Sequence, residues 1–372
     1  MGSGPHAQGA VTYDVAIVGG GPAGLALAIA ARARGLTTVV LERRAFPCDK
    51  ACGEGLMPAG LEVLERLGVR ALIRDEDCTP LAGLRYVQEG AVAQARFTRG
   101  RGLGIRRIAL HAALAERARA VGVELREQSQ VLSHVRERSG VTLETPAGRV
   151  HASMLVAADG LASPIRLREG LEGDPGARRR YGLRRHFQLS PWTDFVEIHF
   201  AEGVEAYVTP VGGCRVGVAF LWKDGALEKA SFEALLARFP ALVERLRGAP
   251  ADSSIRGAGP LARVSRARVR DRFALLGDAA GYVDALTGEG LTLGFLGAEA
   301  LAQLLPAAIA RGVPARSLWR YELAFQRAFL PYKWLAQGML LLTERPWLRR
   351  RVVSLLSRAP WLLRGALWAL HL

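Results

Sequence analysis

The sequence predicts an α/β fold with an α+β insertion: a Rossmann-like nucleotide-binding domain, an inserted antiparallel sheet and a C-terminal helical tail. Three observations lead to this prediction. Apolar β-type runs alternate with Ala- and Leu-rich helical patterns in the parts that flank the insertion. Short runs with period-two alternation and Gly turns lie between them. Residues 345–372 are basic and rich in Trp and Leu.

The first element is a glycine-rich turn between an apolar run and a helical pattern, in "YDVAIVGGGPAGLALAIAARARGLTTVVLER". Gly19 permits the tight turn, Gly21 lets the backbone approach a pyrophosphate, and Gly24 lets helix and strand pack closely. The helix begins at Pro22 and Ala23, where free amides and the helix dipole favour a phosphate. The pattern therefore predicts a dinucleotide site.

Glu42 ends the second apolar run and is followed by Arg43; we assign both to the cofactor site. A carboxylate about twenty residues after the glycines accepts hydrogen bonds from a ribose diol. The same carboxylate would repel a 2′-phosphate, which argues against NADP here. The fingerprint alone does not separate FAD from NAD.

Two later motifs favour FAD. "MLVAADGLASPIR" puts Asp159 at the end of an apolar run, and "RFALLGDAAG" repeats this arrangement with Gly277 and Asp278. Carboxylates at strand ends can accept hydrogen bonds from the row of hydroxyls in a ribityl chain. The sequence holds no second fingerprint of comparable quality, so a reductase with two nucleotide-binding domains is not expected.

The helix expected after "TGEG" would direct its first amides toward the flavin edge that carries N1 and the C2 carbonyl. Negative charge collects there when the ring is reduced, and a helix N-terminus stabilises it. The residues assigned to this contact are Gly288, Glu289, Gly290 and Leu291. Because no His or Cys lies in a compelling attachment motif, we expect FAD to bind non-covalently.

With these motifs, residues 11–310 resemble the FAD-dependent superfamily of p-hydroxybenzoate-hydroxylase-like monooxygenases, geranylgeranyl reductases and flavin-dependent halogenases. The resemblance implies that the glycine motif and Glu42 hold the ADP half. It implies that Arg107, in "RRIALHAAL", lies beside the flavin and that Asp278 holds the ribityl chain. "KACGEGLMP" and "EAYVTPVGG" also resemble bacterial FAD-dependent oxidoreductases associated with type III polyketide synthases. The halogenases' WxWxIP segment and active-site Lys are not evident.

We expect three structural parts. A discontinuous FAD-binding domain comprises residues 11–75, 100–170 and 262–310, and a substrate-binding sheet domain comprises 76–99 and 171–261. A C-terminal helical region, 311–372, completes the chain. Substrate is expected to enter between the sheet and the FAD domain.

Four residues are candidates for direct chemistry. Tyr207, His186 and His199 are candidate acceptors for a phenol proton, and the sequence does not choose among them. Cys52 is either a packed thiol or a cavity residue that helps protonation. Both histidines have a simpler interpretation as parts of a polar strand face turned to solvent. Likewise, Glu54 and Glu289 are candidates for polarising a substrate or are simply solvated.

The favoured function is an FAD-dependent monooxygenase that uses NADPH or NADH as a transient reductant and O2 to hydroxylate an apolar aromatic, lipid-like or polyketide substrate. One alternative is a geranylgeranyl-reductase-like enzyme that reduces isoprenoid double bonds. Another is a non-catalytic flavoprotein that binds a partner enzyme. Residues 345–372 suit either peripheral contact with an anionic membrane surface or packing over the FAD domain with Arg outward.

Composition limits the remaining classes. The chain has 372 residues, a formal net charge of +15 and a hydrophobic share of 50%, which suffices for a full core. The excess Arg is scattered, so we expect no nucleic-acid partner. The cysteines lack zinc-like spacing, so we expect reduced thiols and no metal. The start "MGSGPHAQGAVTYD" indicates a flexible leader without a signal peptide, which favours a cytoplasmic protein. Peripheral contact with the inner membrane face stays open as an alternative.

Overall fold

The computed structural model describes residues 12–177 and 179–369, so most of the expected leader lies outside the described residues. An eight-stranded sheet forms the nucleotide-binding part, with its main path in the order β17-β18-β11-β1-β2-β8. Strand β1 pairs in parallel with β2 and β11, and β11 pairs in parallel with β18. The strands of this sheet are β1 (Thr12–Val18), β2 (Thr38–Leu41), β8 (Glu124–Arg126), β9 (Ser133–Arg136), β10 (Val141–Thr145), β11 (Gly148–Ala157), β17 (Val269–Arg270) and β18 (Phe273–Leu275).

Both faces of this parallel sheet are buried, as its near-continuous apolar strands require. Val15 and Ile17 of β1 pack in the core with α1, α3 and α7, whereas Ala16 and Val18 join a second cluster that includes Phe325. The helices and 3-10 turns of this part are α1 (Pro22–Arg32), α2 (Pro58–Arg66), η1 (Arg70–Leu72), η2 (Asp75–Asp77), α3 (Arg107–Ala120), α4 (Pro164–Arg168), η3 (Gly277–Ala279) and α7 (Gly290–Ala310).

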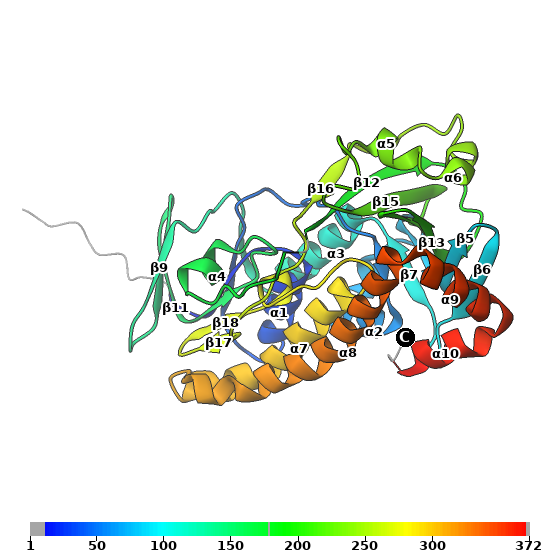
Figure 1. Ribbon diagram of the computed structural model, residues 1–372. Coiled ribbons are helices and arrows are strands. Elements are labelled where there is room, and N and C mark those ends of the chain that lie inside the picture. Colours follow the sequence, from blue (N-terminus) through cyan, green and yellow to red (C-terminus); the bar gives the residue numbers. More distant parts are fainter. Residues whose placement is uncertain (1–11, 178, 370–372) are drawn as a thin grey trace, which may run out of the picture.

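A second, seven-stranded sheet lies beside the first part, in the order β16-β12-β15-β14-β13-β5-β6 (Figure 1). It is antiparallel except that β13 pairs in parallel with β5, which comes from far upstream. Helices α5 (Phe232–Leu236) and α6 (Pro240–Arg245) pack on one face through Phe232 and Leu242. Its strands are β5 (Gly83–Gln88), β6 (Ala91–Arg96), β12 (Arg180–Gln188), β13 (Phe195–Ala201), β14 (Val204–Pro210), β15 (Arg215–Lys223) and β16 (Arg256–Ala258).

A small sheet in the order β3-β7-β4 joins the two parts; its strands are β3 (Gly55–Leu56), β4 (Cys78–Leu81) and β7 (Gly102–Ile105). The chain ends in η4 (Ala315–Leu318), α8 (Trp319–Glu344), α9 (Pro346–Arg358) and α10 (Pro360–Ala369). Helix α8 packs along α7, while α9 and α10 return to β6 of the seven-stranded sheet (Figure 1). The fold is therefore the Rossmann-like domain with an inserted sheet and helical tail that the sequence predicts.

One helix in the described part of the chain, α7, is long and apolar enough to cross a membrane. Its Phe295, Leu301 and Leu305 are buried in the core with α1, which is the environment of an interior helix. All four cysteines are free thiols. No group of three or more metal-ligating side chains occurs among the described residues.

Candidate functional site

A cavity of about 580 Å³ extends from the glycine-rich turn to the seven-stranded sheet. It receives residues from the carboxyl ends of the parallel strands, where open α/β sheets bind ligands. The sequence-predicted cofactor residues in its lining are Gly21, Pro22, Ala23, Arg43, Arg107, Asp159, Gly277, Asp278, Gly288, Gly290 and Leu291. Segments distant in sequence are thus brought together around one space.

The three glycines of the fingerprint, Gly19, Gly21 and Gly24, are needed for different structural reasons. Gly19 has φ of 104°, and a Cβ there would lie 2.4 Å from the Ala158 carbonyl oxygen. A Cβ on Gly24 would lie 2.1 Å from the Gly19 carbonyl oxygen. At Gly21, in contrast, the nearest atom to an added Cβ is Arg107 Nη2 at 3.9 Å. Gly19 and Gly24 are required for packing, and Gly21 leaves room for a ligand.

Glu42 organises the turn. Its Oε2 accepts a hydrogen bond from the Gly20 amide at 2.8 Å, and its Oε1 accepts one from the Arg44 amide at 3.1 Å. An ionised carboxylate has about four acceptor positions, so capacity remains for a ribose diol. Arg43 lines the cavity next to it.

Arg107 begins α3 and is directed toward the glycine-rich turn. Its Nη2 is the nearest atom to the open side of Gly21, and its buried Nε has no hydrogen-bond partner within the described chain. An unpaired guanidinium beside free amides at the N-terminus of α1 suits a pyrophosphate.

Asp159 and Asp278 lie at the ends of neighbouring parallel strands, β11 and β18. Asp159 Oδ2 accepts the Ile165 amide at 3.3 Å, but its Oδ1 is buried and lacks a partner among the residues described. Burial raises the pKa of both carboxyls, and Arg107 partly offsets this rise at Asp278. Acceptors left open in this way fit the hydroxyls of a ribityl chain.

The N-terminus of α7 lies at the same cavity, through Gly288, Gly290 and Leu291. Gly288 has φ of 70°, which a side chain would disfavour. Glu289 is the residue that precedes the helix, and its carboxyl is buried; Oε1 has no partner in the described residues. Burial raises the pKa of Glu289 to about 7. The α7 backbone, more than the Glu289 side chain, therefore faces the ligand space.

The sheet supplies an apolar wall. Alternate residues of its strands face the cavity, and they are Leu84, Tyr86, Val196, Ile198, Tyr207, Ala219 and Leu221. Tyr207 donates a hydrogen bond from its hydroxyl to the Leu286 carbonyl at 3.0 Å. Burial raises the pKa of Tyr207 well above its usual value, so it remains a neutral phenol.

The other catalytic candidates lie in different places relative to the cavity. His199 lies on the opposite face of β13 from Val196 and Ile198, with its Nε2 3.2 Å from Glu197 Oε2. This face is not solvated, because Glu197 is buried. Although burial raises the pKa of Glu197, hydrogen bonds from His199, Trp192 and Arg85 lower it to about 2. His199 thus lies beside the ion pair of Arg85 with the buried Glu197, away from the cavity.

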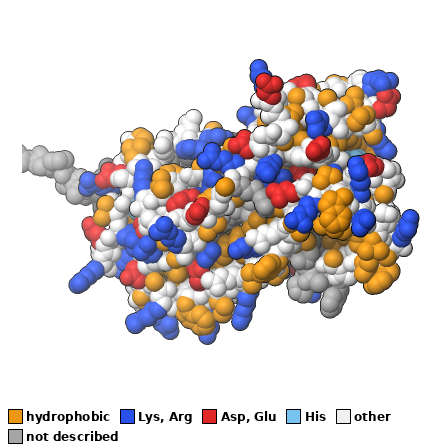
Figure 2. Space-filling model, in the orientation of Figure 1, with side chains coloured by type: hydrophobic (Ala, Val, Ile, Leu, Met, Phe, Trp, Pro, Cys, Tyr) orange, Lys and Arg blue, Asp and Glu red, His pale blue; other side chains and the backbone are white. Residues whose placement is uncertain are grey.

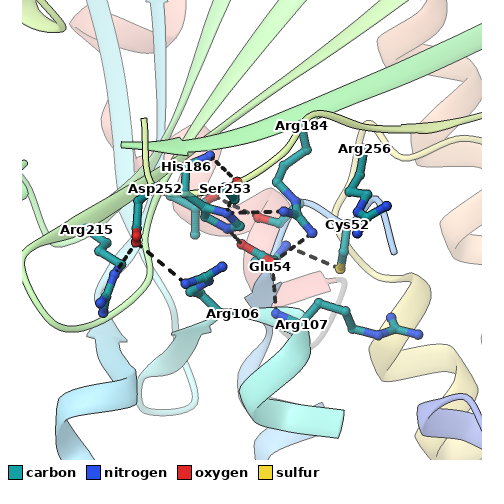
Figure 3. A network of polar contacts seen from close by, with 12 residues as sticks. Cys52, Glu54, Arg106, Arg107, Arg184, His186, Arg215, Asp252, Ser253 and Arg256 are labelled. Atoms are coloured by element: carbon teal, nitrogen blue, oxygen red, sulfur yellow. Dashed lines mark hydrogen bonds and ion pairs between the residues drawn. The ribbon is translucent and has the colours of Figure 1, made fainter. Parts of the chain in front are cut away.

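His186 is also buried, behind Glu54 (Figure 3). Its Nε2 lies 2.5 Å from Glu54 Oε2, and its Nδ1 lies 2.9 Å from Ser253 Oγ and 3.1 Å from Arg184 Nη1. Because Arg184 can only donate, Nδ1 accepts and Nε2 donates to Glu54. His186 therefore orients Glu54, which is only 3% exposed and not solvated.

This network holds the loop that carries Cys52. Arg184 also donates to Asp49 Oδ1 at 2.5 Å, and Glu54 Oε1 accepts the Arg107 amide at 2.8 Å. Cys52 Sγ accepts the Glu54 amide at 3.4 Å, and Cys52 lines the cavity (Figure 3). Burial raises the pKa of the Cys52 thiol.

Sequence reasoning missed Arg184, Ser253 and Tyr282. Arg184 stands two positions before His186 on one strand, so the period of two could have found it. Ser253 is 67 positions from His186, in a loop with no local signal. Tyr282 lies just after the "GD" motif and lines the cavity.

Comparison with known proteins identifies the family. Residues 12–323 match the family described as FAD binding domain. This match spans most of the chain, so the chain belongs to the FAD binding domain family and its cofactor is FAD. The orphaned acceptors, the free Arg107 Nε and the open face of Gly21 fit this cofactor.

Named relatives differ in activity. A 12-dehydrotetracycline 5-monooxygenase/anhydrotetracycline 6-monooxygenase of Streptomyces rimosus is 30% identical over 352 residues, covering 83% of this chain and 66% of its own. A menaquinone reductase of Mycobacterium tuberculosis is 28% identical over 341 residues, covering 85% and 82%. Conditioned medium factor receptor 1 of Dictyostelium discoideum is 26% identical over 349 residues, covering 83% and 66%. The chain thus spans about two thirds of the first and third relatives.

A solved structure shows the same fold. The flavoprotein/dehydrogenase from Cytophaga hutchinsonii superposes with a TM-score of 0.81 at 18% identity, covering 93% of each chain. At this identity the likeness concerns the fold alone.

Proposed function

We propose that this chain is an FAD-dependent oxidoreductase that works as a monooxygenase on an apolar aromatic substrate, with NADPH or NADH as transient reductant and O2 as oxidant. One observation carries the proposal. A single cavity joins the dinucleotide cradle around Gly21 and Asp278 to the apolar sheet wall around Val196 and Tyr207. A substrate seated on that wall would lie against the cofactor.

Different residues of the cavity would bind the cofactor and the substrate. Gly21, Arg107 and the start of α1 would hold the pyrophosphate, and Asp159 and Asp278 would hold the ribityl chain. Bound FAD supplies the two-electron redox chemistry and the activation of oxygen. The apolar wall excludes water and orients the aromatic ring, while Tyr207 anchors the wall to the Leu286 carbonyl.

Three further features support this choice. The monooxygenase name of the Streptomyces relative agrees with it. The domain division drawn above would place substrate between the sheet domain, residues 76–99 and 171–261, and the FAD part. The resemblance to oxidoreductases associated with type III polyketide synthases would make the substrate a phenolic polyketide or lipid.

The second candidate is a reductase of isoprenoid double bonds. Cys52 favours it, because a half-buried thiol at the cavity, with its pKa raised, stays protonated and is able to donate a proton to a substrate carbon. The name of the Mycobacterium relative is also that of a reductase.

Labelled oxygen distinguishes the candidates. FAD-loaded protein is incubated with NADPH or NADH, isotopically labelled O2 and a set of 4-alkylphenols and prenyl lipids. We expect substrate-stimulated oxidation of the nicotinamide and label in a hydroxylated phenol. Saturation of a prenyl double bond without O2, and with no label incorporated, would instead establish the reductase. Failure of both nicotinamides to reduce the flavin would favour a non-catalytic flavoprotein.

We also propose that the protein works in the cytoplasm and contacts the inner membrane face through residues 345–372. Helix α9 exposes Trp347, Arg351, Leu355 and Arg358, which recur at spacings of three or four residues and so share one face. Hydrophobic side chains lie among Lys and Arg over α9 (Figure 2). A lipid-like substrate would reach the cavity from such a surface.

A further inference from the structure

Tyr282 presents its hydroxyl to the part of the cavity that lies beside the N-terminus of α7. Tyr282 is half-buried and lines the cavity, and its hydroxyl makes no hydrogen bond with any residue that the structure describes. The nearby lining residues Met57, Ala285, Leu286 and Leu261 offer apolar side chains. A phenol hydroxyl is both donor and acceptor, and one that is removed from water needs a partner.

The position of this hydroxyl is fixed by the backbone. Tyr282 and Arg263 exchange two backbone hydrogen bonds, of 2.9 Å and 2.7 Å. Its ring packs beside the first residue of α7, since a Cβ built on Gly290 would lie 3.0 Å from the ring and 3.6 Å from the hydroxyl oxygen. The hydroxyl therefore lies beside the α7 N-terminus, where the cofactor site meets the sheet wall.

The electrostatic surroundings keep this group protonated. Burial first, and then Tyr332, Asp278, Asp284 and Cys52, raise the pKa of Tyr282 well above its usual value. A neutral phenol is able to donate a hydrogen bond to a ligand oxygen that gains negative charge during the reaction. No proton is transferred from Tyr282 in this contact.

Two other tyrosines line the cavity: Tyr86 belongs to β5 in the sheet wall, and Tyr207 is already hydrogen-bonded. Tyr207 donates its hydroxyl proton to the Leu286 carbonyl. His186 is 1% exposed and is occupied by Glu54, Arg184 and Ser253. Tyr282 is thus the better placed donor than either of these earlier candidates.

We propose that Tyr282 is the residue that recognises the polar head of the substrate, and that this head is a hydroxyl on an aromatic ring whose apolar remainder lies on the sheet wall. The proposal rests on the proposed function, since it specifies the substrate class of the same cavity. In that reaction Tyr282 would hold the ring oxygen while the ring is oxidised.

A binding comparison tests this proposal. FAD-loaded protein is titrated with 4-butylphenol and with butylbenzene, and dissociation constants are measured by calorimetry and by the change in flavin absorbance. We expect the wild-type protein to prefer the phenol by about fivefold or more, as one neutral hydrogen bond provides. Tyr282→Phe should abolish most of this preference, with little change in butylbenzene binding.

Tyr207→Phe is the matched control, because it removes a hydroxyl from the same cavity that is already hydrogen-bonded to the protein. It should keep the preference for the phenol. An unchanged preference in Tyr282→Phe, or an equal loss in Tyr207→Phe, would overturn the proposal, as would failure of both compounds to bind the wild-type protein. Should the Phe variant not fold, Tyr282→Leu gives the same comparison.

These outcomes do not depend on turnover. Phenol preference through Tyr282 without label from O2 would contradict the monooxygenase while leaving the recognition site in place. Labelled product, together with no effect of Tyr282→Phe on the preference for the phenol, would support the monooxygenase and contradict the role of Tyr282 in recognition.

Discussion

At the scale of single residues, the sequence identified the positions where the backbone itself is constrained. Gly19 and Gly24 are required because backbone atoms lie where a Cβ would stand, and such requirements produce recognisable motifs. Asp159 and Asp278 were predictable for a different reason, because each comes shortly after the end of an apolar strand. The Glu54–His186–Ser253 chain was not, because its members come from three segments that only the fold brings together.

The glycines provide a prediction that separates packing from ligand binding. Gly24→Ala should destabilise the apoprotein by several kcal/mol, since its Cβ would lie 2.1 Å from a carbonyl oxygen. Gly21→Ala should leave the apoprotein's thermal midpoint nearly unchanged but weaken FAD binding at least tenfold, because the methyl group enters the space for the pyrophosphate. Thermal unfolding of apoprotein and FAD titration measure the two effects. Normal FAD affinity in Gly21→Ala would show that the pyrophosphate lies elsewhere.

Glu289 gives a pH-dependent prediction. Its pKa is raised from 4.5 to about 7, so the folded state disfavours the ionised carboxyl. The resulting penalty is absent below about pH 4.5, grows as pH rises toward 7 and is complete above that pH. Glu289→Gln should therefore stabilise the apoprotein at pH 8, by on the order of 3 kcal/mol, and have little effect near pH 4.5.

Denaturant unfolding at the two pH values measures this difference. Glu116→Gln, which changes an exposed carboxyl on α3, is the control and should show no such pH dependence. Equal stability of Glu289→Gln and wild type at pH 8 would mean that the carboxyl finds a partner in solution.

At the scale of elements, the strand and helix patterns predicted most of the fold, but long-range pairings escaped them. Residues 76–99 were assigned to the same sheet domain as 171–261, but no local periodicity encodes the parallel pairing of β5 with β13 in that sheet. Helices α9 and α10 pack on β6 through Val353, Leu363 and Leu367 instead of over the FAD domain. The apolar face against which a helix packs depends on how all the elements of the core fit together, and local sequence does not contain that information.

One buried ion-pair cluster ties these elements together. Arg180 of β12 pairs with Glu205 of β14 and, at 2.9 Å between Nε and Oδ2, with Asp284 in the loop before α7. Arg180→Met should lower stability by about 3–5 kcal/mol, because two buried carboxylates lose their cation. Burial already raises the pKa of Glu205 and Asp284, and loss of Arg180 raises it further.

The folded variant then binds more protons than the unfolded chain. Its loss of stability relative to wild type should therefore grow as pH rises and shrink as pH falls from about 8 to about 5. Thermal midpoints across this range provide the measurement. Arg185→Met is the control, because Arg185 lies on the same strand as Arg180 and forms a partly exposed ion pair with Glu233 of α5. A difference in stability between Arg180→Met and wild type that does not change with pH would show that loss of Arg180 causes neither acid to take up a proton in this range.

At the scale of the whole molecule, the structure corrects the expectation for the tail. Arg349 is 3% exposed and hydrogen-bonds Gln88 at 2.7 Å, so it stabilises the fold and is not free for a membrane. Trp368 lies outside the residues whose side chains are described. Truncation after Glu344 would also uncover the core around Val353 and Leu363, which makes point variants the better test.

The exposed face of α9 should bind anionic vesicles reversibly. Each basic residue at such a surface contributes about 1 kcal/mol, so Arg351→Gln with Arg358→Gln should weaken partitioning into phosphatidylglycerol-containing vesicles by about 30-fold. Trp347→Ala should weaken it as well, because the 57% exposed indole would enter the interface. Co-sedimentation at low and high salt measures binding, and salt should reduce it by screening.

The control pair is Arg311→Gln with Arg316→Gln, two exposed residues at the C-terminal end of α7 and in η4. This double variant has the same net charge as the α9 variant, so it separates a specific surface from general attraction of a basic protein. It should pellet with anionic vesicles almost as wild type does. Equal loss in both double variants would mean that net charge alone drives binding. Absence of binding by the wild type would mean that Trp347 and its neighbouring arginines face water and that substrate reaches the cavity from solution.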